Sequence, residues 1–107
     1  MKHQDFEIIL NNRIESIRKT LNAKGTEYAT EDDRLHNFKV AARIANTTPA
    51  RALKGMFLKH LVSIFDLIDY DAQYGLGPNQ ETYGLIDEKV GDAINYLVLL
   101  EAILKDK

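Results

Sequence analysis

The segment from Pro49 to Gln73 restricts the fold most, because a helix drawn through it is apolar on nearly all sides. A helix of that kind has to be surrounded by other elements. Its start is marked by Thr48, a hydroxyl residue suited to cap a helix, followed by a proline at the first helical position. The segment therefore predicts a long central helix with helical neighbours. Its apolar residues are Leu53, Met56, Phe57, Leu58, Leu61, Val62, Ile64, Phe65, Leu67 and Ile68.

Three other segments have the apolar spacing of amphipathic helices. The first covers residues 5–24 and is followed by Gly25, a residue typical of helix ends. The second follows Thr30, which is placed to cap it, and its many alanines favour close approach to a neighbouring helix. The last runs from Leu85 to Lys105, and Gly84 makes an earlier regular start uncertain. The chain is therefore expected to form four helices.

Four helices with short connections predict an all-α, four-helix bundle-like fold in which residues 1–107 form a single domain. The apolar stripes on the first and last helices are longer than one small core can cover. We therefore expect a homo-oligomer, most simply a two-fold dimer.

Composition excludes several classes of function. A net charge of -2 gives no broad basic surface for duplex nucleic acid. The chain has no cysteine, which excludes disulfides, thiolate catalysis and cysteine-bound zinc. It has no apolar run long enough to cross a membrane and no apolar signal core after Met1. We therefore expect a cytoplasmic protein whose partners are neither duplex nucleic acid nor membranes.

A group of polar residues interrupts the apolar side of the last helix. Glu88, Asp92 and Asn95 are spaced i, i+4 and i+7, so they share one side of that helix, and Tyr96 follows them. Burying such groups costs several kcal/mol unless each has a partner. The identity of these partners therefore decides what this part of the protein does.

Lys59 and His60 of the central helix are expected to lie at the level of Glu88 and Asp92. Three interpretations stay open. The first is a buried layer of ion pairs and hydrogen bonds that fixes the register of the helices. The second is a pocket for an anionic small molecule, in which the lysine and the histidine bind phosphate. The third is a metal-dependent catalytic site, in which the carboxylates bind magnesium.

Two other places carry candidate ligand-binding residues. Arg34, Asn37 and Lys39 lie near the predicted start of the second helix, where free backbone amides and the helix dipole suit an anion. The alternative there is an ordinary solvated helix start. Tyr28 lies in an expected connector, residues 26–30, where it either packs beneath the loop or offers a stacking surface for a base.

Four short motifs resemble those of a group of small phage and prophage proteins: Glu27-Tyr28, Asp33-Arg34-Leu35-x-Asn37-Phe38-Lys39, Lys59-His60 and Glu88-Lys89-x-Gly91-Asp92-x-x-Asn95-Tyr96-Leu97. That group is similar to the all-α nucleoside triphosphate pyrophosphohydrolases of the MazG-like superfamily and to the nucleotide-modification-associated domains. The resemblance covers residues 25–104, and the stretch around Gly91 and Asp92 is its best part.

The resemblance implies a helical, usually dimeric protein that binds nucleotides. Active members of the family use magnesium to hydrolyse triphosphates to monophosphate and pyrophosphate, with acids on two helices. This chain keeps Asp92 but has Lys89 where the pattern has an acid three residues earlier. If Lys59-His60-x-x-Ser63 occupies the place of the first acid cluster, the resemblance implies that basic groups hold phosphate directly.

The leading hypothesis is a phage-type nucleotide-binding protein that sequesters a nucleotide-derived signal of host antiviral defence, such as a cyclic nucleotide, without hydrolysing it and without a cofactor. Its setting is then the cytoplasm of an infected or lysogenic bacterial host. One alternative is a divergent pyrophosphohydrolase with magnesium bound by Glu88, Asp92, Asp66 and Asp69. A second is a protein-interaction module that inhibits a host factor. The predicted ligand-binding residues are Lys59, His60, Asp92, Asn95, Tyr96, Arg34, Asn37, Lys39 and Tyr28, with Glu88 and Asp66 as acidic partners that orient them.

Overall fold

The computed structural model describes residues 1–28 and 33–106, and of residues 24–28 the backbone alone. Over these residues the chain has four helices and no strand, which confirms the expected all-α fold. The contacts divide it into two compact units, Met1–Asn37 and Phe38–Lys107, and each is described by itself. The expectation of a single domain stays a prediction. Within the described part of the chain, no helix has the length and hydropathy needed to span a bilayer.

The first unit is built on α1, which runs from His3 to Tyr28. A turn before the second helix is tied back to α1, because Arg34 Nη2 donates a hydrogen bond of 2.7 Å to the backbone oxygen of Leu21. The backbone N–H of Leu35 donates to Asp33 Oδ1 at 2.9 Å and closes the turn.

The length of α1 corrects the expected end at Lys24. The helix continues through Gly25, so Glu27 and Tyr28 lie in α1 and not in a connector. Glycine inside a helix costs only about 1 kcal/mol relative to alanine, and it ends a helix mainly where its backbone turns left-handed. A glycine after a lysine is therefore a weaker stop signal than its frequency at helix ends indicates.

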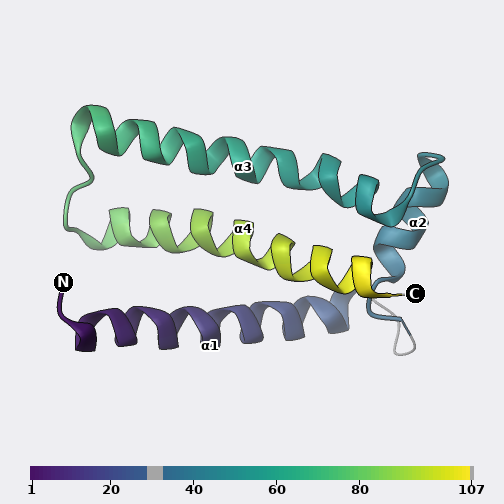
Figure 1. The fold of residues 1–107 in the computed structure, drawn as a ribbon, viewed down its shortest axis with the longest axis horizontal. Helices are drawn as coiled ribbons and strands as arrows, with labels where there is room; N and C mark the ends of the chain where they lie inside the picture. Colours follow the sequence, from purple (N-terminus) through teal and green to yellow (C-terminus); the bar gives the residue numbers. More distant parts are fainter. Residues whose placement is uncertain (29–32, 107) are drawn as a thin grey trace. The chain divides into compact units, whose positions relative to one another are not determined.

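The second unit contains most of α2 (His36–Ile44), α3 (Pro49–Tyr74) and α4 (Gln80–Lys105). Helices α3 and α4 lie side by side and antiparallel, joined by residues 75–79 (Figure 1). Helix α2 lies at the end of this hairpin where α3 begins and α4 ends. The hairpin is the element on which the candidate site is built.

Helix α2 begins at His36, later than expected; the proposed cap, Thr30, lies outside the described residues. It ends at Ile44, ahead of Asn46, which has a positive φ of 53°. Asparagine tolerates this left-handed conformation better than most residues. The backbone N–H of Thr47 then donates to the oxygen of Ala42 at 2.8 Å, which completes the helix end and leads into α3.

Both ends of α3 follow the sequence signals. Thr48 has an extended backbone (φ -96°, ψ 157°), and its Oγ1 accepts a hydrogen bond of 3.3 Å from the backbone N–H of Arg51. Pro49 occupies the first turn, as expected. Gly75, with a positive φ of 76°, ends the helix.

Helix α4 begins five residues earlier than expected, at Gln80 and not at Leu85. Asn79 caps it, because its Oδ1 accepts a hydrogen bond of 2.9 Å from the backbone N–H of Thr82. Gly84 lies inside the helix and does not interrupt it. The additional turn brings Glu81 and Thr82 opposite the last turns of α3.

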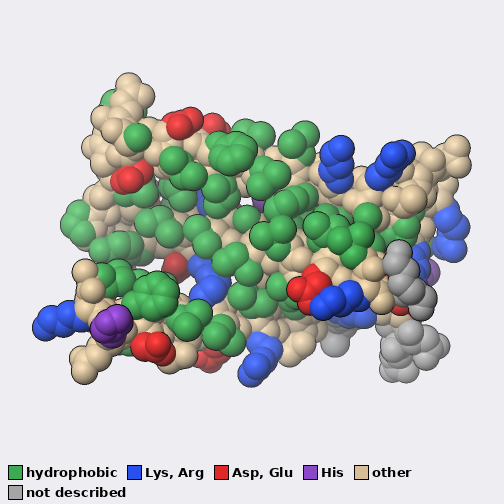
Figure 2. All heavy atoms as spheres, viewed as in Figure 1, with side chains coloured by type: hydrophobic (Ala, Val, Ile, Leu, Met, Phe, Trp, Pro, Cys, Tyr) green, Lys and Arg blue, Asp and Glu red, His purple; other side chains and the backbone are tan. Residues whose placement is uncertain are grey.

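The best-buried apolar side chains of the second unit lie at one end of the hairpin. They are Leu53 of α3 (1% exposed), Ala42 of α2 and Ile103 of α4. An ion pair of 3.0 Å between Lys39 Nζ and Asp106 Oδ2 joins α2 to the end of α4 at the same place. Elsewhere on the hairpin many hydrophobic side chains remain on the surface (Figure 2).

Candidate ligand-binding site

A cluster of rings and charge joins the middle of α3 to the middle of α4. His60 Nδ1 lies 3.6 Å from Asp92 Oδ2, close enough for an ion pair when the histidine is protonated. The ring of Tyr96 lies 4.8 Å from the imidazole, centre to centre, and 5.7 Å from the ring of Phe57, against which it stacks at 14°. The register expected from the sequence therefore does place His60 against Asp92.

The phenol of Tyr96 reports on the environment of this cluster. Burial raises its pKa above the ordinary value of about 10, because the phenolate loses hydration there. The negative charge of Asp92 raises the pKa further. Tyr96 is therefore a neutral hydrogen-bonding group over the physiological range of pH.

The predicted polar stripe of α4 passes from solvent to interior along the helix. Glu88 is exposed, Asp92 is half-buried and Asn95 is only 8% exposed. The Oδ1 atom of Asn95 is buried and has no hydrogen-bond partner among the described residues. Gly91, one turn before Asn95, is also buried.

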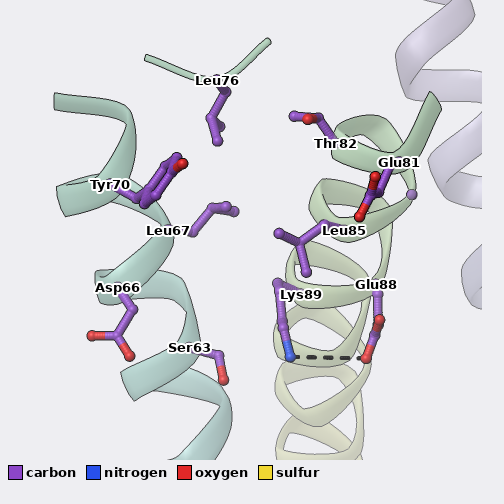
Figure 3. Close-up of a pocket in the computed structure, with 11 residues that line it drawn as sticks. Ser63, Asp66, Leu67, Tyr70, Leu76, Glu81, Thr82, Leu85, Glu88 and Lys89 are labelled. Carbon is purple, nitrogen blue, oxygen red and sulfur yellow. Dashed lines mark ion pairs between the residues drawn. The ribbon is translucent and has the colours of Figure 1, made fainter. Parts of the chain in front are cut away.

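A groove of about 880 Å³, open to solvent and called the cavity below, lies between the second half of α3 and the first half of α4. In Figure 3, Leu67, Leu76 and Leu85 lie nearest one another across the gap, with Tyr70 on the α3 side and Thr82 on the α4 side. Leu76 comes from the loop that joins the two helices. The lining is thus an apolar centre with an aromatic ring and polar groups around it.

The charged residues of the lining are mostly acidic. Asp66 comes from α3, while Glu81, Glu88 and Lys89 come from α4. Lys89 Nζ lies 3.8 Å from Glu88 Oε1, so one carboxylate already has a cationic neighbour (Figure 3). Three carboxylates and one lysine give this lining a net negative charge. It therefore favours ligand groups that donate hydrogen bonds and disfavours a bare anion.

The cavity and the cluster adjoin each other along the hairpin. Ser63, on the cavity wall, is one helical turn beyond His60 on α3. Lys89, on the opposite wall, is one turn before Asp92 on α4. Because the helices are antiparallel, these two steps run in the same direction, and the cluster forms one end of a continuous site.

Comparison of the chain with protein-family models, with curated proteins and with solved structures finds no match. The geometry of the site is therefore the guide to its function. That geometry combines two acids expected from the sequence, Glu88 and Asp66, with a wall the sequence did not indicate.

Three of the predicted ligand-binding residues contact one another, and Lys59 and Asn95 lie beside them on α3 and α4. His60, Asp92 and Tyr96 form the cluster. Lys59 is exposed on α3, and the side chain of Tyr28 lies outside the described residues.

The candidates around the second helix make contacts of their own. Arg34 bonds to a backbone oxygen of α1, and Asn37 is exposed on α2. Lys39 pairs with Asp106, which at 1.5 Å per residue is about 20 Å beyond Asp92 along the chain of α4. Lys39 therefore belongs to the opposite end of the hairpin from the cavity.

The four acids considered as magnesium ligands are not brought to one point. Asp66 and Glu88 line the cavity, Asp92 faces His60, and Asp69 is exposed on α3. Within the described ranges, no three histidine, aspartate or glutamate side chains form a group that could hold a metal ion.

The sequence analysis missed most of the cavity wall. Tyr70 lies near the end of α3, Leu76 in the loop and Thr82 in the first turn of α4, and only the hairpin geometry brings them together. Small and polar residues on the inner side of two facing helices, Ser63 and Gly84, are the signal that could have indicated a gap there.

Proposed function

We propose that the chain binds a nucleotide or cyclic nucleotide between α3 and α4. The observation that carries this proposal is the cavity of about 880 Å³, whose wall combines a tyrosine and leucines with hydroxyls, carboxylates and a lysine. Cavities of about 300–1,000 Å³ with an apolar wall and a few polar groups are the usual sites for small molecules.

The wall offers partners for the base and the sugar of a nucleotide. The ring of Tyr70 and the leucines suit the faces of a base. The hydroxyls of Ser63 and Thr82, and the carboxylates near them, suit sugar hydroxyls and base amino groups, which donate hydrogen bonds. The acidic lining disfavours phosphate in the centre, so we place the phosphate beyond Lys89, toward His60 and Lys59.

We propose further that the ligand is a nucleotide-derived signal of host antiviral defence and that the protein holds it intact. The support is the resemblance of residues 25–104 to MazG-like phage proteins. If Lys59-His60-x-x-Ser63 occupies the place of the first acid cluster of that family, basic residues stand where the family pattern has acids. A protein of this kind acts in the cytoplasm of the infected host by lowering the free concentration of the signal. It needs binding affinity and no catalytic step.

Self-association is part of the same proposal. Several large apolar side chains are more than 40% exposed on α1, among them Phe6, Ile9 and Ile14, and others are exposed on the hairpin. Contiguous exposed apolar surface of this kind marks contact with another protein. A second copy of the chain is the simplest partner.

Calorimetric titration with a panel of nucleoside triphosphates, cyclic mononucleotides and cyclic dinucleotides tests the binding, with and without EDTA. We expect binding of at least one of them that EDTA does not change, with the ligand recovered intact. Magnesium-dependent release of pyrophosphate would contradict sequestration and support the pyrophosphohydrolase alternative. Absence of binding to every nucleotide would leave the interaction module as the better account.

Lys59→Ala tests the placement of the phosphate. We expect weaker binding by about 1 kcal/mol or more, the typical loss for a hydrogen bond to a charged group, with an unchanged circular dichroism spectrum. Lys105→Ala is the matched control, because it removes an exposed lysine from the far end of α4. Equal affinities of the two variants would show that the phosphate lies elsewhere.

A further inference from the structure

Helix α3 has apolar residues on two opposite sides. One side carries Leu53, Phe57 and His60 toward α4, where the first is almost completely buried and the other two are half-buried. At 100° per residue, Leu58, Val62 and Phe65 fall on the side opposite to these. Those three side chains are 50–61% exposed in the hairpin.

The outer side of α3 also has opposite charges at its two ends. Arg51 and Lys54 precede the apolar stretch on the same side of the helix, and Asp69 follows it. Figure 2 shows the basic side chains over the N-terminal end of α3 and acidic ones toward its C-terminal end. The surface is therefore basic, apolar and acidic in that order.

We propose that this outer side of α3, Lys54 to Asp69, is the interface with a second copy of the chain, with the two α3 helices antiparallel. An antiparallel pair brings the basic end of one copy against the acidic end of the other. A two-fold axis between Leu61 and Val62 places residue 54 opposite residue 69 and residue 58 opposite residue 65. The charges are then complementary and the apolar centres meet.

The residues of this surface are arranged symmetrically about the axis, so a second copy of the chain is the partner that matches it. Lys54 and Asp69 are equally far from it, and so are Leu58 and Phe65. An isologous two-fold contact requires such self-complementarity of one surface. A parallel pair would instead put lysine against lysine and aspartate against aspartate, which is destabilising.

This interface rests on the proposed self-association and gives it a location. Lys54→Glu alone and Asp69→Lys alone should each raise the dissociation constant of the homodimer about tenfold, since each creates two like-charge contacts. An equimolar mixture of the two variants should form a heterodimer as tight as the original dimer, because all its contacts are complementary. Sedimentation equilibrium and native mass spectrometry measure both quantities.

Single cysteines provide an independent test, because the chain has no native cysteine. Val62→Cys lies beside the axis and should form a disulfide-linked dimer under mild oxidation. Lys54→Cys should not link to itself, because its two copies lie about 22 Å apart in the antiparallel pair. A mixture of Lys54→Cys with Asp69→Cys should link.

The possible failures are distinct. If the dissociation constant of the homodimer is the same for wild type and the charge variants, or if Lys54→Cys links to itself, the antiparallel α3 interface is wrong. Self-association as such would still stand. A monomer in which Val62→Cys stays unlinked overturns both. Nucleotide binding is measured separately and survives either result.

Discussion

Asp92 acts on two neighbours in different ways. It lies within ion-pair distance of His60, and its negative charge adds to the burial that keeps the proton on Tyr96. The sequence indicated this pairing through helix register alone, since residues 59–60 and 88–92 were expected at one level. The role of Phe57, which stacks on Tyr96, was not foreseen, because its ring looked like ordinary core.

The raised pKa of Tyr96 can be tested by substituting Tyr96 and Asp92. In a spectrophotometric titration of the five tyrosines, the component with a pKa above 10 should disappear in Tyr96→Phe. In Asp92→Asn that pKa should fall but stay above 10, because burial is the larger of the two causes. A titration curve identical in wild type and Asp92→Asn would contradict the contact.

The same pKa shift makes stability depend on pH in the alkaline range. Between the ordinary pKa and the raised one, the unfolded chain loses its proton first, so the free energy of unfolding decreases as pH rises. Below pH 10 this contribution is fully present. Urea unfolding at several alkaline pH values should show a shallower decrease for Tyr96→Phe than for wild type, and parallel decreases would count against a buried phenol.

At the scale of the elements, caps were better guides than glycines. Thr48 and Pro49 correctly marked the start of α3, because a capping hydroxyl and a fixed φ act on the helix end itself. Gly25 and Gly84 misled, because both lie inside helices. Only where the backbone turns left-handed, as at Gly75, does glycine end the helix.

This difference predicts opposite effects of one substitution at two glycines. Gly84→Ala should raise the free energy of unfolding by about 0.5–1 kcal/mol, because alanine is the better helix former and its Cβ meets no atom within 4 Å. Gly75→Ala should lower it by about 1–3 kcal/mol, because its φ of 76° is strained for alanine. Urea denaturation measures both, and effects of the same sign would contradict the helix bounds.

At the scale of the whole molecule, the all-α class followed from periodicity, and the cavity did not. Apolar spacing reports which side of a helix is covered, whereas a gap depends on how far two helices diverge and where a loop residue such as Leu76 is placed. Lys39 shows that a sequence pattern can also point to a site from which the residue is distant. Its place in a family-like motif pointed to the site, but its partner is Asp106 at the other end of the hairpin.

We propose above all that a nucleotide binds between α3 and α4. The most direct measurement is a two-dimensional amide NMR titration of the isotopically labelled chain with the nucleotide that binds best in calorimetry. The shifts should be largest in residues 59–70 of α3 and 82–92 of α4, with smaller changes near Lys39 and Asp106. Shifts confined to other parts of the chain, or no shift with any nucleotide of the panel, would contradict the claim.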